Sequence, residues 1–195
     1  MGYTGFERLW LFFAFSFFGW VLETVTAAVR QRRFVNRGLV NGPFCVLYGI
    51  TGTAMLVVCR ELHGIWLFLG SMIFSTLAEW IAGHVIERMY HERWWDYSHM
   101  KWNLDGYICV PVSIVWGVLG AATMRWGAPV LVRVFRMLPR TPGHLIVWIL
   151  AAVLAMDVTA TLCILSGRSR RIRQWEGVDS WLTGVSSRLE RKIYG

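Results

Sequence analysis

Three long apolar runs constrain this chain more than any other feature of its sequence. They cover residues 9–29, 65–86 and 145–165, and the acids inside them are Glu23, Glu79 and Asp157. About 18 apolar residues suffice to cross the hydrocarbon core of a bilayer. Only 16% of the residues are charged, against about 25% in soluble domains. The sequence therefore predicts an integral membrane protein and excludes a soluble globular enzyme.

The apolar segments predict an all-α fold, a polytopic membrane helix bundle in one domain. We expect about five transmembrane helices, at 9–29, 44–59, 65–86, 107–124 and 145–165. The second and fourth are the shortest, and they carry glycines that would allow close helix contact. These glycines are Gly49, Gly52, Gly117 and Gly120. The transmembrane bundle is expected to occupy residues 1–167.

The remaining residues, 168–195, have the pattern of an amphipathic helix. Apolar residues recur at spacings of three and four, and they are Trp175, Val178, Leu182, Val185 and Leu189. Arginines immediately precede them, as expected for a helix that lies on anionic headgroups at the cytoplasmic leaflet. An ordinary helix packed on the cytoplasmic loops is the alternative.

The distribution of basic residues predicts the orientation in the membrane. With five spans, fourteen Lys and Arg fall on one side and six on the other. The positive-inside rule then places the N-terminus outside and the C-terminus in the cytoplasm of a multi-pass cell-membrane protein. Residues 125–140 do not fit this pattern, because they are basic but fall on the outer side. They are expected to form either an external loop or an interfacial helix.

Several function classes are excluded or disfavoured by what these 195 residues contain. There is no G-x-x-x-x-G-K-[ST] motif, so any ATPase would have to be a separate chain. The four cysteines are scattered, so we expect neither a disulfide frame nor a metal site, and no cofactor. The net charge of +8 fits orientation in the bilayer and attraction to anionic lipid, so no nucleic-acid partner is expected.

The acids inside the apolar runs predict a polar chamber. An ionisable residue at the centre of a membrane helix costs about 2.5–3.5 kcal/mol, so it needs a compensating environment. Glu23, Glu79 and Asp157 lie on parallel helices at similar distances from their ends, which places them in one layer on the cytoplasmic side of the midplane. Tyr48 and Ser113 fall at similar depth. The alternative is that these acids pair with arginines of residues 30–37 or with neighbouring hydroxyls.

The third run places four residues on one ridge that leads from the interior to the cytoplasmic rim. Ser75, Glu79, Gly83 and Glu87 are each four residues apart. Gly83 leaves room beside Glu79 for another helix or a ligand. His84, next to it, is expected to be a hydrogen-bonded neighbour rather than a metal ligand.

Two predicted cytoplasmic loops carry the densest polar chemistry. The loop at 30–43 includes Arg33, Asn36 and Arg37, and its arginines could bind lipid phosphate, an anionic ligand or the buried acids. In the second loop, Trp95 and Asp96 form either an interfacial anchor or an aromatic wall with a polar tip. We expect Asp96 to cap a turn through Ser98.

These loops, with the helix before each, resemble a family of small bacterial membrane proteins, the ABC-transporter permeases of the CmpB type. The matching segments are FGWVLE at 18–23, FVNRG at 34–38, GPFC at 42–45, YG at 48–49, WWDYS at 94–98 and GYI at 106–108, with Glu79, Glu87, Asn103, Ser113, Trp116 and Gly117. The resemblance covers about residues 10–120. It departs at Tyr107, where members often have a basic residue.

The resemblance implies a transport subunit in which Glu23, Arg37, Glu79, Asp96 and Asn103 form one functional unit. The candidate cavity residues are Glu23, Arg37, Tyr48, Glu79, Glu87, Trp95, Asp96, Asn103 and Ser113, and the weaker candidates are Arg33, Asn36 and Asp157. Such a permease subunit would face the cytoplasm with a polar cavity. It would need a homodimer or a larger partner and an ATP-binding subunit in trans, with residues 87–106 as the docking element.

Two other functions remain open at this point. The chain could be a membrane-embedded enzyme acting on a lipid or isoprenoid, with Glu23, Glu79, Asp96 and Asp157 as acids or bases. No nucleophile constellation or Mg²⁺-binding Asp motif supports that reading, so we expect no catalytic residues. The third possibility is a non-catalytic scaffold or regulator, in which the acids only lock helices together.

Overall fold

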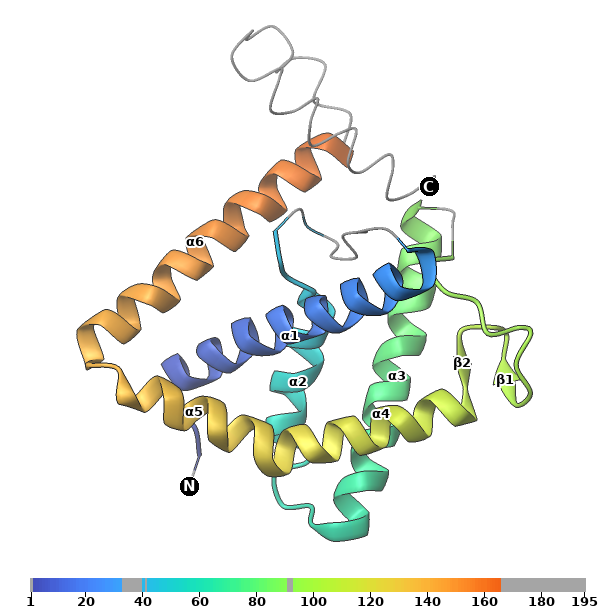
Figure 1. Cartoon of the computed structure of the whole chain (residues 1–195), viewed down its shortest axis with the longest axis horizontal. Coiled ribbons are helices and arrows are strands. Elements are labelled where there is room, and N and C mark those ends of the chain that lie inside the picture. Colours follow the sequence, from blue (N-terminus) through green and yellow to red (C-terminus); the bar gives the residue numbers. More distant parts are fainter. Residues whose placement is uncertain (1, 33–39, 41, 91–92, 166–195) are drawn as a thin grey trace, which may run out of the picture. The chain divides into compact units, whose positions relative to one another are not determined.

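The computed structural model describes residues 2–32, 40, 42–90 and 93–165, and nearly all of these are helical (Figure 1). The elements in chain order are α1 (Gly5–Gln31), α2 (Val46–Val58), α3 (Gly64–Tyr90), β1 (Asn103–Leu104), β2 (Ile108–Cys109), α4 (Val110–Ala122), η1 (Thr123–Gly127), α5 (Ala128–Met137) and α6 (Arg140–Leu165). Arg33, Asn36, Arg37 and the predicted helix at 168–195 lie outside the described residues.

The predicted all-α membrane fold is confirmed. Four helical segments of the described chain are long and apolar enough to cross a bilayer, and they are Gly5–Val29, Gly64–Arg88, Val110–Met137 and Arg140–Cys163. The helix predicted at 44–59 is present as α2 but has only 13 residues. At 1.5 Å per residue it is about 20 Å long, shorter than the hydrocarbon core of about 30 Å.

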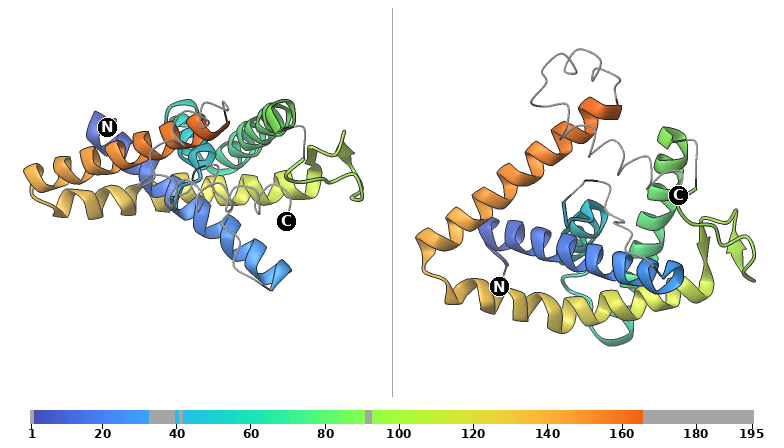
Figure 2. Two further views of the ribbon diagram at one scale, coloured as in Figure 1. Left: turned by 90° about the horizontal axis from the view of Figure 1, so that it is seen from above. Right: turned by 45° about the horizontal axis from the view of Figure 1, so that its top comes forward.

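Residues 125–137, expected as an external loop or an interfacial helix, continue the fourth helix. A π-helical turn, η1, joins α4 to α5, and the ribbon runs on as one helical stretch (Figure 2). The N–H of Ala128 donates to the carbonyl of Thr123. Pro129 explains this geometry, because proline lacks an N–H and its ring clashes with the carbonyl four residues earlier. A π turn shifts the hydrogen-bond register and lets the helix continue.

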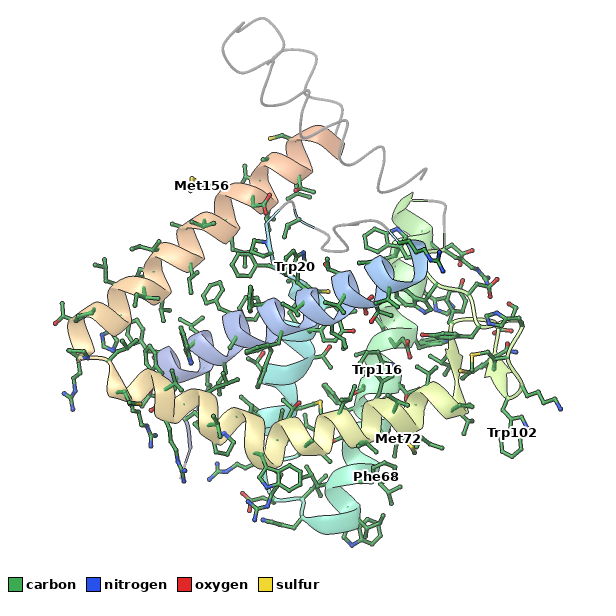
Figure 3. The ribbon with its side chains drawn as sticks, in the orientation of Figure 1. Trp20, Phe68, Met72, Trp102, Trp116 and Met156 are labelled. Atoms are coloured by element: carbon green, nitrogen blue, oxygen red, sulfur yellow. The ribbon has the colours of Figure 1, made fainter. Side chains whose placement is uncertain are left out.

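The described chain forms two compact units. The first unit contains Met1–Phe12 and Leu47–Leu138, and the second contains Phe13–Val46 and Pro139–Gly195. In the first unit α4 packs closely on α3, as its glycines predict. A Cβ added to Gly117 would lie 2.8 Å from Met72 and from the ring of Phe68, both labelled in Figure 3. Any larger residue would force these two helices apart.

The first turn of α1 is fixed to α5 within the first unit. Thr4 and Glu7 form a reciprocal capping box, because the N–H of each residue donates to the other's side chain. Glu7 is 6% exposed, and its Oε1 lies 2.6 Å from Nε of Arg136. Trp10 donates from Nε1 to the carbonyl of Leu131 at 2.9 Å. A charged pair and an indole hydrogen bond therefore join two segments that are far apart in sequence.

In the second unit α6 exposes a row of large apolar side chains. Trp148 and Met156 are more than 60% exposed, which is expected of a helix whose surroundings are lipid rather than water. The same unit contains the non-helical residues 42–45, which precede α2. Their backbone N–H groups donate to Ser16 of α1 and to Asp157 of α6.

Candidate functional site

A polar cluster of the first unit is formed where the α3–α4 loop folds back on α3. Glu79, Gly83 and Glu87, three residues of the predicted ridge, each contact a side chain of this loop. The ridge spans eight residues, or about 12 Å of helix. A short polar loop thus lines a continuous stripe of a membrane helix.

Glu79 lies deepest along this stripe. It is half-buried and nine residues before Arg88, where the candidate span ends, or about 14 Å along the axis. The hydroxyl of Tyr97 donates to its Oε1 at 3.0 Å. The backbone of Tyr97 is itself fixed, because its N–H donates to the carbonyl of Gly106 at 2.8 Å and its carbonyl accepts from Met100. The loop therefore presents a phenol to a carboxylate inside the membrane span.

Gly83 provides the surface on which the loop rests. A Cβ at this position would lie 2.7 Å from Cδ1 of Tyr107 and 3.4 Å from Cζ2 of Trp95. The indole N–H of Trp95 donates to the carbonyl of Tyr107 at 2.9 Å. Trp95 therefore packs as a wall against α3. The space beside Gly83 is filled by these two rings.

Glu87, Arg93 and Tyr107 form a charged network at the end of the stripe. Nε of Arg93 lies 3.1 Å from Oε1 of Glu87, and the hydroxyl of Tyr107 donates to Oε2. The guanidinium of Arg93 also lies 4.5 Å from the centre of the Tyr107 ring. Arg93 thereby places a positive charge beside Tyr107.

The network has a definite protonation pattern. The hydrogen bond to Glu87 raises the pKa of Arg93, and the hydrogen bond from Tyr107 to the same carboxylate raises the pKa of Tyr107. Both groups therefore keep their protons at neutral pH. Glu87 accepts hydrogen bonds from Arg93 and Tyr107. This arrangement fits a structural role of Glu87 as well as a role in ligand binding.

His84 belongs to the same region. Its ring stacks on Tyr107 with centroids 4.0 Å apart, and its Nδ1 lies 2.9 Å from the carbonyl of Trp80. These contacts agree with the predicted hydrogen-bonded neighbour. Among the described residues, no group of three His, Cys, Asp or Glu could hold a metal ion.

The tip of the loop is shaped by side chains that bond to nearby backbone. Oδ1 of Asp96 accepts from the N–H of Ser98 at 2.8 Å and from its hydroxyl at 2.5 Å. This confirms the predicted turn. The Ser98 hydroxyl, with its N–H, holds the pKa of Asp96 below its usual range.

Asn103 and Gly106 complete the turn chemistry. The amide of Asn103 donates to the carbonyl of Met100 at 2.7 Å, and its oxygen accepts from the N–H of Gly106 at 3.1 Å. Gly106 has φ +77, and a Cβ there would lie 2.5 Å from the side chains of Asp96 and Ser98. Both the backbone conformation and the close approach require glycine.

Tyr48 and Ser113 lie elsewhere in the first unit, on α2 and α4. The ring of Tyr48 contacts that of Trp116 edge-on, with centroids 5.8 Å apart, and Ser113 is buried.

Glu23 and Asp157 belong to the second unit, where Asp157 accepts from the N–H of Gly42 at 2.6 Å. The predicted layer of three carboxylates therefore remains a prediction, as does its cytoplasm-facing cavity.

Sequence reasoning missed Arg93, Tyr97 and Tyr107 as site residues. Tyr97 offered a signal, since it stands two positions after Trp95 in the same polar run. Arg93 was counted only for the orientation of the chain. Its partner Glu87 is six residues away across the end of α3, and helix periodicity does not reach across such a turn.

The sequence model of a known family matches residues 10–162 of the chain, and this family is described as "Putative ABC-transporter type IV". The chain belongs to this family. The match runs from within α1 to near the end of α6, so it covers the helices as well as the loops. The resemblance to CmpB-type proteins is thereby confirmed. No curated protein and no solved structure is significantly similar to this type IV family member.

Proposed function

We propose that this chain is a membrane-embedded permease subunit whose ATP-binding subunit is a separate polypeptide. Its family, its four long apolar helices and the lack of a P-loop in its 195 residues support this proposal. The observation that carries it is the hydrogen bond between Tyr97 and Glu79. Ionisable residues inside membrane spans commonly mark substrate or ion pathways, and this one is reached by a polar loop.

The α3–α4 loop, with the end of α3 (residues 87–106), is the proposed docking element for the ATP-binding subunit. The positive-inside distribution supports placing it in the cytoplasm. Hydrogen bonds preorganise residues 96–106 of this element, because Asp96 and Asn103 hold the backbone there without help from a partner. Its tip is accessible, since Trp102 is 76% exposed. A rigid tip loses little conformational freedom when a partner binds.

Co-purification tests this assignment. An affinity-tagged chain solubilised from its native membrane is expected to retain an ATP-binding protein, which mass spectrometry identifies. Trp102→Ala is expected to weaken retention, whereas Trp126→Ala, at another highly exposed tryptophan, on η1 (65% exposed), serves as the control. A clean preparation without an ATP-binding protein would count against a transporter of this kind.

A second candidate, a non-catalytic scaffold, is favoured by one observation. Glu87, Arg93 and Tyr107 satisfy one another, as expected of groups that only lock a loop to a helix. Glu79→Gln separates the two candidates. Loss of folding alone supports the scaffold, and a folded protein without its cellular phenotype supports a transport site.

A further inference from the structure

The chain returns deep into the second unit before α2 begins. The N–H of Cys45 donates to the carbonyl of Ser16 at 2.9 Å. Ser16 is fifteen residues before the end of α1 at Gln31, which is about 22 Å of helix. It lies close to the middle of the candidate span Gly5–Val29. At residue 45 the chain has therefore returned to the level of the middle of the α1 span.

Residues 42–45 are not helical at this depth. Bare backbone groups cannot face lipid, so each needs a partner inside the protein. The structure supplies them: Gly42 N–H donates to Oδ2 of Asp157 at 2.6 Å, Phe44 N–H to the carbonyl of Gly42 at 2.8 Å, and Cys45 N–H to Ser16. Pro43 has no N–H to satisfy. All the amide donors of this stretch are accounted for.

The hydrogen bond from the N–H of Gly42 explains why an acid, Asp157, lies in the apolar helix α6. Asp157 is six residues before Cys163, where the candidate span of α6 ends, or about 9 Å along the axis. Gly42 approaches it so closely that a Cβ would lie 3.0 Å from Oδ2. The ring of Phe44 is buried and meets Phe13 of α1 with centroids 6.0 Å apart. The stretch is fixed to α6 at one end and to α1 at the other.

We propose that residues 42–45 form a non-helical break at the level of the middle of the α1 span, and that Asp157 is the residue that positions the break. Ser16 of α1 and Asp157 of α6 hold its two ends within the second unit.

The consequence for function rests on the permease role proposed above. In transport proteins, discontinuous helices provide the backbone groups that meet substrates or coupling ions near the midplane. The break at residues 42–45 is then part of the transport path. The structural proposal itself is tested on the chain alone, without an ATP-binding subunit or substrate, so either claim can fail without the other.

Thiol crosslinking in native membranes measures the depth of the break. Cys45 is kept, the other three cysteines are replaced by alanine, and a second cysteine is placed at Ser16 or at Ala27, both buried on α1. A short bis-methanethiosulfonate crosslinker is expected to join Cys45 to position 16 in much higher yield than to position 27. A preference for position 27, or no product at either, overturns the proposal.

Variants of Asp157 test the positioning role in the same assay. Asp157→Ala removes the acceptor and is expected to lower the yield with position 16 several-fold, whereas Asp157→Asn keeps an acceptor oxygen and should restore most of it. Thr159→Ala is the matched control, because the hydroxyl of this exposed residue bonds to its own helix at Ala155. Gly42→Ala, which acts from the other partner, should also lower the yield. Unchanged yields in Asp157→Ala and Gly42→Ala overturn the role of Asp157.

Discussion

At the scale of single residues, the α3–α4 loop owes its shape to a few side chains with local partners. Asp96 closes a turn on Ser98, Asn103 bonds to Met100 and Gly106, and Trp95 reaches the carbonyl of Tyr107. Gly83 then allows the loop to approach α3. The position of Tyr97 beside Glu79 follows from these contacts.

The role of Gly83 predicts a stability change. Gly83→Ala places a methyl group 2.7 Å from the Tyr107 ring and is expected to lower the free energy of unfolding by about 1–3 kcal/mol, the usual cost of overpacking. Thermal unfolding of the detergent-solubilised protein measures it. Gly127→Ala is the control, because its nearest neighbour would be 3.6 Å away. Equal unfolding temperatures for the two variants would contradict the close packing.

The Asp96 turn predicts a dependence on pH. The folded pKa of Asp96 is lowered by Ser98, below an unfolded value of about 3.9. The stabilisation is therefore fully present above the unfolded pKa and is lost as the pH falls through the folded pKa. Carboxyl NMR titration should show the Asp96 pKa rising towards its usual range in Ser98→Ala. An unchanged pKa in that variant would mean that the hydroxyl does not hold the carboxylate.

Residue-scale prediction from sequence succeeded where partners are close in the chain. The Asp96–Ser98 turn spans two residues, and side chains of this kind bond locally. The contact of Tyr97 with Glu79 joins residues 18 positions apart across a helix end. Its formation depends on how the whole loop folds back, which periodicity does not describe.

At the scale of elements, the helices follow the apolar runs, and the differences have local causes. Gly117 and Gly120 contact α3 closely, as expected of small residues in a membrane bundle. The fourth helix runs on through α5 because a π turn accommodates Pro129. The short α2 follows from the non-helical stretch before it. Neither a π turn nor a membrane-embedded break has a signal in hydropathy alone.

The junction of α1 and α5 predicts the behaviour of two neighbouring arginines. Arg136 pairs with the buried Glu7, so Arg136→Gln leaves a buried carboxylate without its cation. We expect a drop of several degrees in the unfolding temperature. Arg133→Gln, at an exposed residue of the same helix, should change it little. Similar values for both variants would show that the pair contributes nothing to the junction.

At the scale of the whole molecule, the distribution of basic residues predicts that the N-terminus lies outside and the C-terminus in the cytoplasm. A C-terminal green fluorescent protein should then fluoresce, and an N-terminal epitope should be labelled on intact cells. Termini on the same side would contradict this orientation.

The predicted chamber shows what whole-molecule reasoning from sequence cannot supply. Counting residues from helix ends estimates the depth of Glu23, Glu79 and Asp157, since the rise per residue is constant. It does not give the direction in which each side chain faces around its helix axis. For Glu79 and Asp157 the structure gives partners, Tyr97 and Gly42, that depth alone did not indicate.

The central claim is that Glu79 serves transport rather than only holding the fold. The most direct measurement is the ATP hydrolysis rate of the complex with its co-purified ATP-binding subunit in nanodiscs. Glu79→Gln is expected to keep the unfolding temperature and to lower the rate about tenfold, or about 1.4 kcal/mol in activation free energy. Glu61→Gln, at a highly exposed side chain, should keep the full rate. A folded Glu79→Gln complex with an unchanged rate would contradict the claim.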